Sequence, residues 1–158
     1  INYIESENIK VLPQNYLLDD LMTKDLNYTS TVPKDADIET IRVGIEASKM
    51  LTIIDAGQTA VVKDGSVISL EGVEGTDKTI QRAYDLAGKN CIIVKSARPK
   101  QDNRIDIPTI GLDTIKKIVE INAKGIVIEA DKMLFLDQDE VISYANKNKI
   151  FIKGMKYD

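Results

Sequence analysis

The chain has 158 residues, a length that suits one domain with a sizeable hydrophobic core and leaves little room for two. Hydrophobic residues make up 43% and charged residues 29%, and no apolar stretch approaches the ~20 residues that cross a bilayer. The formal net charge of -4 argues against binding to nucleic acid, which needs a clustered excess of Lys and Arg. Because there is no histidine, this chain can form no Ser-His-Asp triad, Cys-His dyad or His-ligated zinc site.

The single cysteine, Cys91, allows no internal disulfide, which agrees with a reducing cytoplasm. It opens an apolar run, so we expect a buried structural thiol rather than a nucleophile. The chain begins Ile1-Asn2-Tyr3, with neither a methionine nor a signal-peptide leader. We therefore expect it to be a piece of a longer protein.

The N-terminal third predicts three elements in chain order. A short strand is expected at 9–12 and a short helix at 16–22, where three leucines share a face. The segment 35–51 predicts a longer helix, with acidic residues at its start and Lys49 near its end. Its expected inward face consists of residues at three-to-four spacing: Ile38, Ile41, Ile45 and then Ser48 or Lys49.

The segment 59–72 predicts a β-hairpin, because two β-branched runs are joined by Asp64-Gly65, a pair that tolerates the positive φ angles of a type I′ turn. A helix is expected to begin with Thr76 as its N-cap and to end at Gly88. Its expected inward stripe consists of three small or apolar residues: Ile80, Ala83 and Ala87.

The remaining sequence alternates between strands and helices. Strands are expected at 91–95, 125–130, 133–136 and 150–155. Asp113 is expected to cap a helix that runs to Ala123 and is ended by Gly125, and Asp137 with Glu140 has the spacing of a capping box. We therefore predict one α/β domain over 1–158, with a mixed sheet that is largely parallel, an antiparallel hairpin, and helices packed on the sheet.

The charged segment 95–111 follows a strand that should be buried. If 102–107 is extended, two isoleucines face one side while Asp102, Arg104 and Asp106 face the other. This face is either a surface ion pair or a site where carboxylates hold a divalent cation and Arg meets phosphate. The neighbouring cations favour the second interpretation and a diphosphate substrate: Lys95, Arg98 and Lys100.

A second candidate is the segment 71–77, EGVEGTD. Gly72 and Gly75 allow a close approach of the backbone to a ligand, and the segment leads to a helix N-terminus, which favours anions. The alternative is an ordinary strand-to-helix turn capped by Thr76. Neither a Walker lysine at the right spacing nor a GxGxxG pattern is present, so the familiar nucleotide-binding loops are not supported.

Four segments in this order, DAGQTAVVKDG, EGVEGTDKTI, VKSARPKQDNRIDIPTIGLDTI and GIVIEADKMLFLD, carry a resemblance that covers residues 4–155. Together they resemble the C-terminal domain of the LpxI-type UDP-2,3-diacylglucosamine hydrolases. The resemblance implies a cytoplasmic, inner-membrane-associated enzyme of lipid A biosynthesis that hydrolyses a diphosphate with Mg²⁺, or alternatively Mn²⁺. Its implied products are UMP and 2,3-diacylglucosamine 1-phosphate.

The resemblance also implies a set of site residues. The catalytic aspartate falls on Asp102, as a metal ligand or as the base that orients water, with Asp106 and Lys95 beside it. Asp77 and Glu74 are expected to complete the metal site. The expected substrate-binding residues are Gln101, Arg104, Thr76, Gly75 and Arg98.

Two departures from the family pattern are Lys100, where a glycine is usual, and Asp131, where the pattern has glycine in EAG. Family members also carry an N-terminal Rossmann-like domain, a partner that this chain lacks, so we expect the isolated piece to fold but to be inactive or nearly so. A homodimer is also compatible with the sequence. The alternatives to an enzyme are a non-catalytic module that binds a sugar nucleotide or anion, and a purely structural dimerisation domain.

Overall fold

The computed structural model describes residues 1–13, 15–99 and 106–157. The α-helices are α1 (Asn2–Ser6), α2 (Asn15–Leu18), α3 (Asp35–Ile53), α4 (Thr76–Ala87), α5 (Leu112–Glu120) and α6 (Gln138–Lys147), and a short 3-10 helix, η1 (Asp19–Leu21), follows α2. The strands are β1 (Thr59–Lys63), β2 (Ser66–Leu70), β3 (Ile92–Lys95), β4 (Thr109–Ile110), β5 (Gly125–Glu129), β6 (Leu134–Phe135) and β7 (Phe151–Met155).

Five strands form the main sheet, in the order β2-β1-β3-β5-β7. β1 pairs antiparallel with both β2 and β3, whereas β3, β5 and β7 run parallel. β4 and β6 form a small parallel sheet of their own. The predicted α/β class, with a mixed and mostly parallel sheet, is confirmed.

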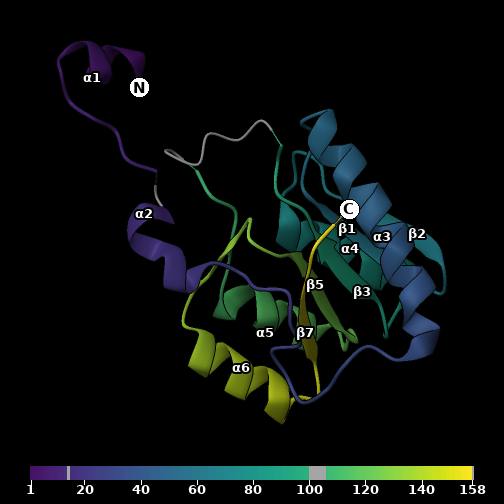
Figure 1. Cartoon of the computed structure of the whole chain (residues 1–158). Helices are drawn as coiled ribbons and strands as arrows, with labels where there is room; N and C mark the ends of the chain where they lie inside the picture. The colour runs from purple at the N-terminus through teal and green to yellow at the C-terminus, as the bar shows by residue number, and fades with distance from the viewer. Residues whose placement is uncertain (14, 100–105, 158) are drawn as a thin grey trace.

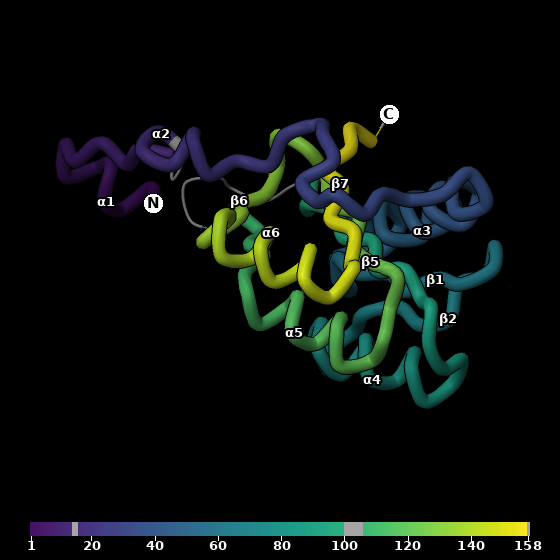
Figure 2. The backbone as a smooth tube through the Cα atoms, turned by 90° about the horizontal axis from the view of Figure 1, so that it is seen from below, coloured from purple at the N-terminus to yellow at the C-terminus, as the bar shows by residue number. Residues whose placement is uncertain are grey.

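The helices cover the main sheet on both faces (Figures 1 and 2). One face packs against α3 through Val62, Val94 and Val127, together with Ile41 of the helix. The other face carries α4, α5 and α6, whose buried residues join one larger core with the alternate strand positions. Because neighbouring side chains of a strand point to opposite faces, a sheet covered on both sides needs continuous apolar strands, as this sequence has.

Helix α3 lies close to the sheet at Gly44. A Cβ atom at this position would come within 2.5 Å of Val94 Cγ2, so only glycine lets the helix approach so far. The buried face of α3 therefore includes Ile41, Gly44, Ser48 and Leu51. The predicted inward face was wrong at Ile38, which is 52% exposed.

The N-terminal segment departs from the sequence prediction. No strand forms at 9–12, and Ile9 and Leu12 are 58% and 41% exposed. The predicted helix at 16–22 is present as two short pieces, α2 and η1. α1 projects away from the body of the molecule in both Figure 1 and Figure 2. Isolated extended residues without a pairing edge gain no ladder hydrogen bonds, which explains why a β-branched run alone did not become a strand.

The predicted hairpin is confirmed, with Asp64 and Gly65 at φ angles of 48° and 76°. The predicted N-caps of α4 and α5 were wrong, because Gly75 and Gly111 occupy these positions. Asp137 is the N-cap of α6 as predicted, but it lies in a left-handed conformation and makes no side-chain cap hydrogen bond, so the predicted capping box does not form. α5 ends at Glu120, before the predicted Ala123, because Asn122 takes a positive φ of 51°.

Cys91 is buried, and its thiol donates a weak hydrogen bond to the Gly88 carbonyl at 3.4 Å. Burial raises the pKa of the thiol. The prediction of a buried structural thiol is confirmed. Within the described ranges, every helix is too short or too polar to cross a bilayer.

Candidate functional site

The candidate site lies at the edge of the sheet where β3 and β5 end. Lys95 is the last residue of β3 and pairs with Thr59, the first residue of the antiparallel β1. The strand β2 also ends at this edge, so the 71–77 segment begins here. The carboxyl ends of parallel strands are where α/β sheets place their ligand sites.

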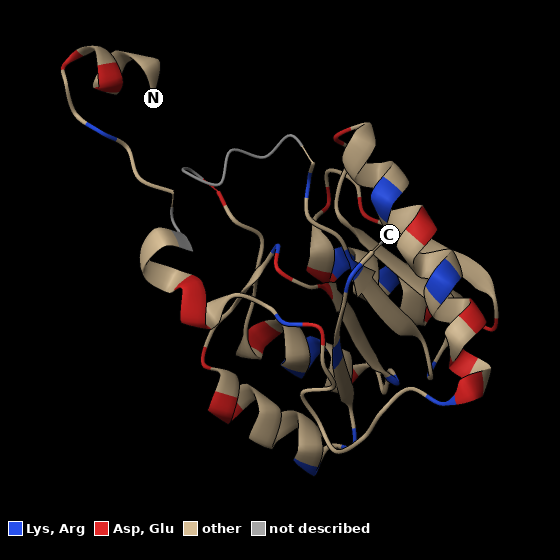
Figure 3. Cartoon of the chain, viewed as in Figure 1, with Lys and Arg blue, Asp and Glu red and all other residues tan. Residues whose placement is uncertain are grey.

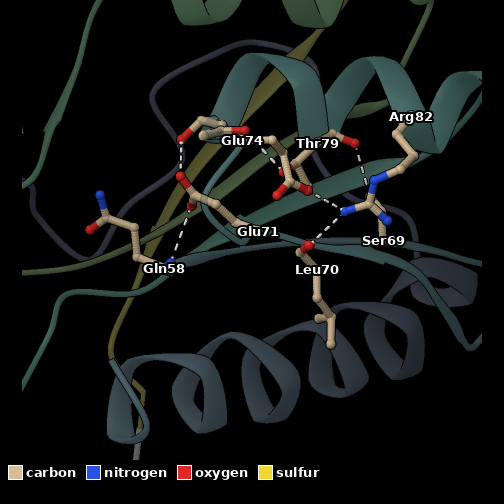
Figure 4. A network of polar contacts seen from close by, with 9 residues as sticks. Gln58, Ser69, Leu70, Glu71, Glu74, Thr79 and Arg82 are labelled. Carbon is tan, nitrogen blue, oxygen red and sulfur yellow. Dashed lines mark hydrogen bonds and ion pairs between the residues drawn. The ribbon is translucent and has the colours of Figure 1, made fainter. Parts of the chain in front are cut away.

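Glu71 organises the start of the 71–77 segment. Its carboxylate is buried and accepts hydrogen bonds from the backbone N–H of Gln58 at 3.1 Å and from the Thr76 hydroxyl at 2.9 Å (Figure 4). The Thr59 and Thr76 hydroxyl oxygens lie 3.4 Å apart. A Cβ atom at Gly57 would lie 2.5 Å from the Glu71 carbonyl oxygen, so these two segments touch through their backbones.

Glu74, an expected metal ligand, is held by neighbours in the same loop and helix. Its Oε1 accepts hydrogen bonds from Arg82 at 2.5 Å and from the Thr79 hydroxyl at 3.2 Å (Figure 4). Its own backbone amide is the main factor that lowers the pKa of the Glu74 carboxyl, followed by Arg82. The same guanidinium donates to the Leu70 carbonyl at 2.8 Å, so Arg82 ties the end of β2 to α4.

Gly75 turns the chain into α4 with φ 83° and ψ 171°, a conformation almost confined to glycine. Thr76 is the first helical residue rather than the cap, and its hydroxyl is directed to Glu71. Asp77 lies exposed in the first turn. Gly75 is thus a conformational requirement, whereas the carboxylate of Asp77 is accessible to a ligand.

Lys95 is the buried cation of this edge. The residue is 6% exposed, and its Nζ donates a weak hydrogen bond to the Thr109 carbonyl at 3.4 Å. Burial lowers the pKa of Lys95, while the negative charges of Glu71 and Asp77 act in the opposite direction. The structure therefore brings Lys95 into one electrostatic neighbourhood with the 71–77 segment, which lies about twenty residues earlier in the chain.

The segment after β3 forms a cleft with the ends of α3 and β5. The Ala97 N–H donates to Glu129 Oε2 at 2.8 Å, and Arg98 Nη1 lies 3.1 Å from Asp55. Tyr157 donates from its hydroxyl to the Lys95 carbonyl at 3.1 Å, and burial raises the pKa of that hydroxyl. The cleft has a volume of about 360 Å³.

Two side-chain atoms in the described part of the chain are buried without a hydrogen-bond partner, and both belong to residues of this edge. They are Gln58 Oε1 and Arg98 Nε. Figure 4 shows the amide of Gln58 turned away from Glu71. Since buried polar atoms are normally hydrogen-bonded, these two atoms are available for contacts with a water molecule, an ion or a polar ligand.

The remaining predicted site residues are distributed as follows. Gln101, Asp102 and Arg104 lie outside the described residues, and Asp106 is exposed just before β4. Among the described residues, there is no group of three or more acidic or cysteine side chains placed to hold a metal ion. Of the predicted metal ligands, Asp77 is the exposed carboxylate of the 71–77 segment, and Asp102 lies outside the described residues.

Sequence reasoning missed Glu71 and Gln58 as site residues, and it also missed Glu129, Lys49 and Lys132 around the cleft. One signal was present for Glu71 and Glu129, because a carboxylate at the end of a strand is out of place unless it is paired. Lys49 and Lys132 carried no such signal, since both fit a solvated helix end or turn.

The fold and this edge define an α/β protein with a candidate site for an anionic ligand at the carboxyl ends of its strands. The model of the LpxI C-terminal domain matches residues 24–153, and the chain belongs to this family. It is 31% identical over 131 residues to the UDP-2,3-diacylglucosamine pyrophosphatase LpxI of Caulobacter vibrioides. The match covers 78% of this chain and 47% of that relative, so the chain spans about half of the relative's length.

Proposed function

We propose that this domain contributes to the hydrolysis of the diphosphate of UDP-2,3-diacylglucosamine in lipid A biosynthesis, yielding UMP and 2,3-diacylglucosamine 1-phosphate. The family relationship supports the substrate and the reaction. The structural observation that carries the proposal is Lys95, a buried cation flanked by an accessible helix turn at the carboxyl edge of the sheet. A positive charge held away from water interacts more strongly with a diphosphate than an exposed one.

Lys95 and Arg98 are proposed to bind the diphosphate oxygens. The strand fixes the backbone of Lys95 and burial restricts its side chain, so its charge is held at this edge of the sheet. Arg98 offers Nε, which is buried and without a partner among the described residues. Asp102, which lies outside those residues, is proposed to orient the attacking water or to bind a metal.

We further propose that Mg²⁺, or Mn²⁺, is the cofactor, with Asp77 and Asp102 as ligands. Such an ion supplies charge neutralisation at the phosphoryl oxygens. Glu74 is the weaker candidate ligand, since Arg82 and Thr79 already occupy its Oε1. We propose a location at the cytoplasmic side of the inner membrane because the substrate is a lipid.

The experiment uses two proteins. One is the 158-residue chain, and the other is a longer polypeptide that contains this chain and is as long as the relative. Hydrolysis of UDP-2,3-diacylglucosamine is followed with and without EDTA and added Mg²⁺. We expect turnover in the longer protein only, abolished by EDTA and restored by the metal. Robust magnesium-dependent hydrolysis by the 158-residue chain alone would contradict the proposed need for the rest of the protein.

Asp102→Ala and Lys95→Met separate an enzyme from a binding module. In the enzyme, Asp102→Ala loses hydrolysis and retains substrate binding, and Lys95→Met weakens both. The matched control is Lys116→Met, because Lys116 is an exposed lysine of α5 that pairs only weakly with Asp113 at 3.7 Å. Equal loss of binding in both site variants, with no turnover in the wild type, would instead identify a non-catalytic module.

A further inference from the structure

A cationic cleft and an apolar groove adjoin on the surface of α3. The cleft described above, about 360 Å³ in volume, is lined in part by Lys49, Arg98 and Lys132. A larger groove of about 700 Å³ follows α3; its lining is mainly apolar, including Met50, Met155 and Tyr157, and also contains Arg42, Glu46 and Lys156. Lys49 and Ile53 line both hollows, so the cationic cleft and the largely apolar groove adjoin at these two residues.

The charged end suits a phosphate. Three cationic side chains line the cleft against one carboxylate, Glu129, and that carboxylate already accepts the Ala97 N–H. Arg98 is paired with Asp55 through Nη1, but its Nε is buried without a partner among the described residues. An anion in the cleft would satisfy this nitrogen.

The apolar end suits a hydrocarbon chain. Met50 and Ile53 are 66% and 59% exposed, and the last turns of α3 beyond Lys49 carry no charge as far as Asp55 (Figure 3). The groove has the size of a typical small-molecule site, which spans roughly 300–1,000 Å³. Large apolar side chains gathered in one open groove mark a binding surface more often than a solvated one.

We infer that this surface binds an amphiphile, with its phosphate in the cleft between Lys49, Arg98 and Lys132 and its acyl chain along the groove of α3. The inference rests on the proposed function in one respect, because it assigns the lipid part of that substrate to a particular face. The occupant is a phosphate-bearing lipid because the cationic cleft and the largely apolar groove adjoin at Lys49 and Ile53. A neutral partner helix would leave the cleft unsatisfied.

The test is the binding of dodecyl phosphate to the 158-residue chain, measured by titration calorimetry below the critical micelle concentration. Inorganic phosphate reports on the cleft alone, and dodecyl maltoside reports on the groove alone. We expect dodecyl phosphate to bind at least about tenfold tighter than either, since each buried methylene adds favourable transfer free energy. Equal affinities for dodecyl phosphate and inorganic phosphate would overturn the inference.

Variants locate the ligand on the surface. Met50→Asn and Ile53→Asn are each expected to weaken dodecyl phosphate binding about fivefold, and Met50→Asn, at a residue outside the cleft, is expected to leave phosphate binding unchanged. Lys132→Met is expected to weaken both ligands. Ile38→Asn is the matched control, because Ile38 is an exposed isoleucine of the same helix that lies outside the groove. Circular dichroism checks that each variant is folded.

Other outcomes overturn the proposal without ambiguity. If Ile53→Asn and Met50→Asn behave like Ile38→Asn, the acyl chain does not lie in the groove. If the wild type instead sediments as a dimer that Met50→Asn dissociates, and no amphiphile binds, a second copy covers the groove. Hydrolysis of UDP-2,3-diacylglucosamine by the longer polypeptide is measured separately. Unchanged KM in Ile53→Asn would refute this surface while leaving the proposed reaction intact, and amphiphile binding without any hydrolysis would do the reverse.

Discussion

The hydroxyl of Thr76 donates a hydrogen bond to the carboxylate of Glu71 at 2.9 Å, which joins the first turn of α4 to the end of β2. The other oxygen of the same carboxylate accepts the backbone N–H of Gln58 at 3.1 Å, just before β1. One buried acid thus holds three chain segments in place beside Lys95. The shape of the candidate site depends on a residue that is not itself expected to touch the substrate.

Glu71→Ala should therefore lower the free energy of unfolding. Removing the carboxylate leaves the Gln58 N–H and the Thr76 hydroxyl without their acceptor, and we expect a loss of about 2 kcal/mol in urea unfolding. Glu120→Ala is the control, because the side chain of Glu120 is 65% exposed and pairs only with a lysine of its own helix. It should change stability by less than about 0.5 kcal/mol. A loss of the same small size in Glu71→Ala would show that water replaces the carboxylate.

Lys95→Met should raise stability while it weakens anion binding. Burial lowers the pKa of Lys95, so keeping its charge in the folded protein costs free energy that a methionine does not require. At pH 7 we expect the variant to be more stable by about 1 kcal/mol, seen as a higher Tm.

The pH dependence of that difference has a definite sign. The folded pKa of Lys95 lies below its ordinary value of 10.5, so the unfolded chain binds more protons between the two values. The wild type therefore gains stability as the pH rises through this window, and the advantage of Lys95→Met should shrink toward pH 10. An advantage that stays constant over this range would mean that the lysine carries no buried charge.

The helices, the hairpin and the sheet class were predictable because each has a local cause in the sequence. Asp64 and Gly65 supply the two positive φ angles of the hairpin turn, and Gly88 ends α4 in the predicted place. Apolar runs such as 125–130 are continuous because the sheet is covered on both faces. These features depend on residues that are close together in the sequence, so they can be predicted from the sequence alone.

The errors have a tertiary origin. Thr76 is a residue type that often caps helices, yet its hydroxyl donates a hydrogen bond to Glu71. No sequence spacing predicts this contact. Ile38 matches the helical period, but the buried face of α3 runs through Ile41 and Gly44, which leaves Ile38 exposed. Ser48, an expected inward residue, is buried and hydrogen-bonds to Ser96 at 2.6 Å. The convergence of Lys95 with the 71–77 segment was found by resemblance, since it depends on the strand order. The predictions for Gln101, Asp102 and Arg104 remain predictions.

Gly75→Ala should be much more costly than Gly65→Ala. A Cβ atom at either glycine would meet no atom within 4 Å, so neither substitution creates a clash with a neighbour. The difference lies in the backbone, because Gly75 combines φ 83° with ψ 171°, whereas Gly65 lies in a turn with φ 76°. We expect losses of roughly 3 kcal/mol at Gly75 and roughly 1 kcal/mol at Gly65 in urea unfolding. Equal losses would show that the chain before α4 rearranges freely.

Asp37→Asn should remove stability at neutral pH but not in acid. Asp37 is 4% exposed, and burial alone would raise its pKa. The hydrogen bonds from the Lys124 side chain and from the Lys34 N–H outweigh burial, so the pKa is lowered from its ordinary 3.8. A carboxyl with a lowered folded pKa stabilises the protein above its unfolded pKa, and this contribution disappears as the pH falls through the folded value.

Asparagine keeps an acceptor for the Lys34 N–H but loses the ion pair with Lys124. We expect Asp37→Asn to be about 2 kcal/mol less stable at pH 7, below the usual cost of breaking a fully buried pair because the Lys124 side chain is 37% exposed. Urea unfolding from pH 7 to pH 2 should show the wild-type and variant curves converging only below the ordinary aspartate pKa of 3.8. Asp113→Asn, at an aspartate whose side chain is 99% exposed, is the control and should follow the wild type throughout. Parallel curves for Asp37→Asn and the wild type down to pH 2 would mean that the lost stability comes from packing, not from the charge of Asp37.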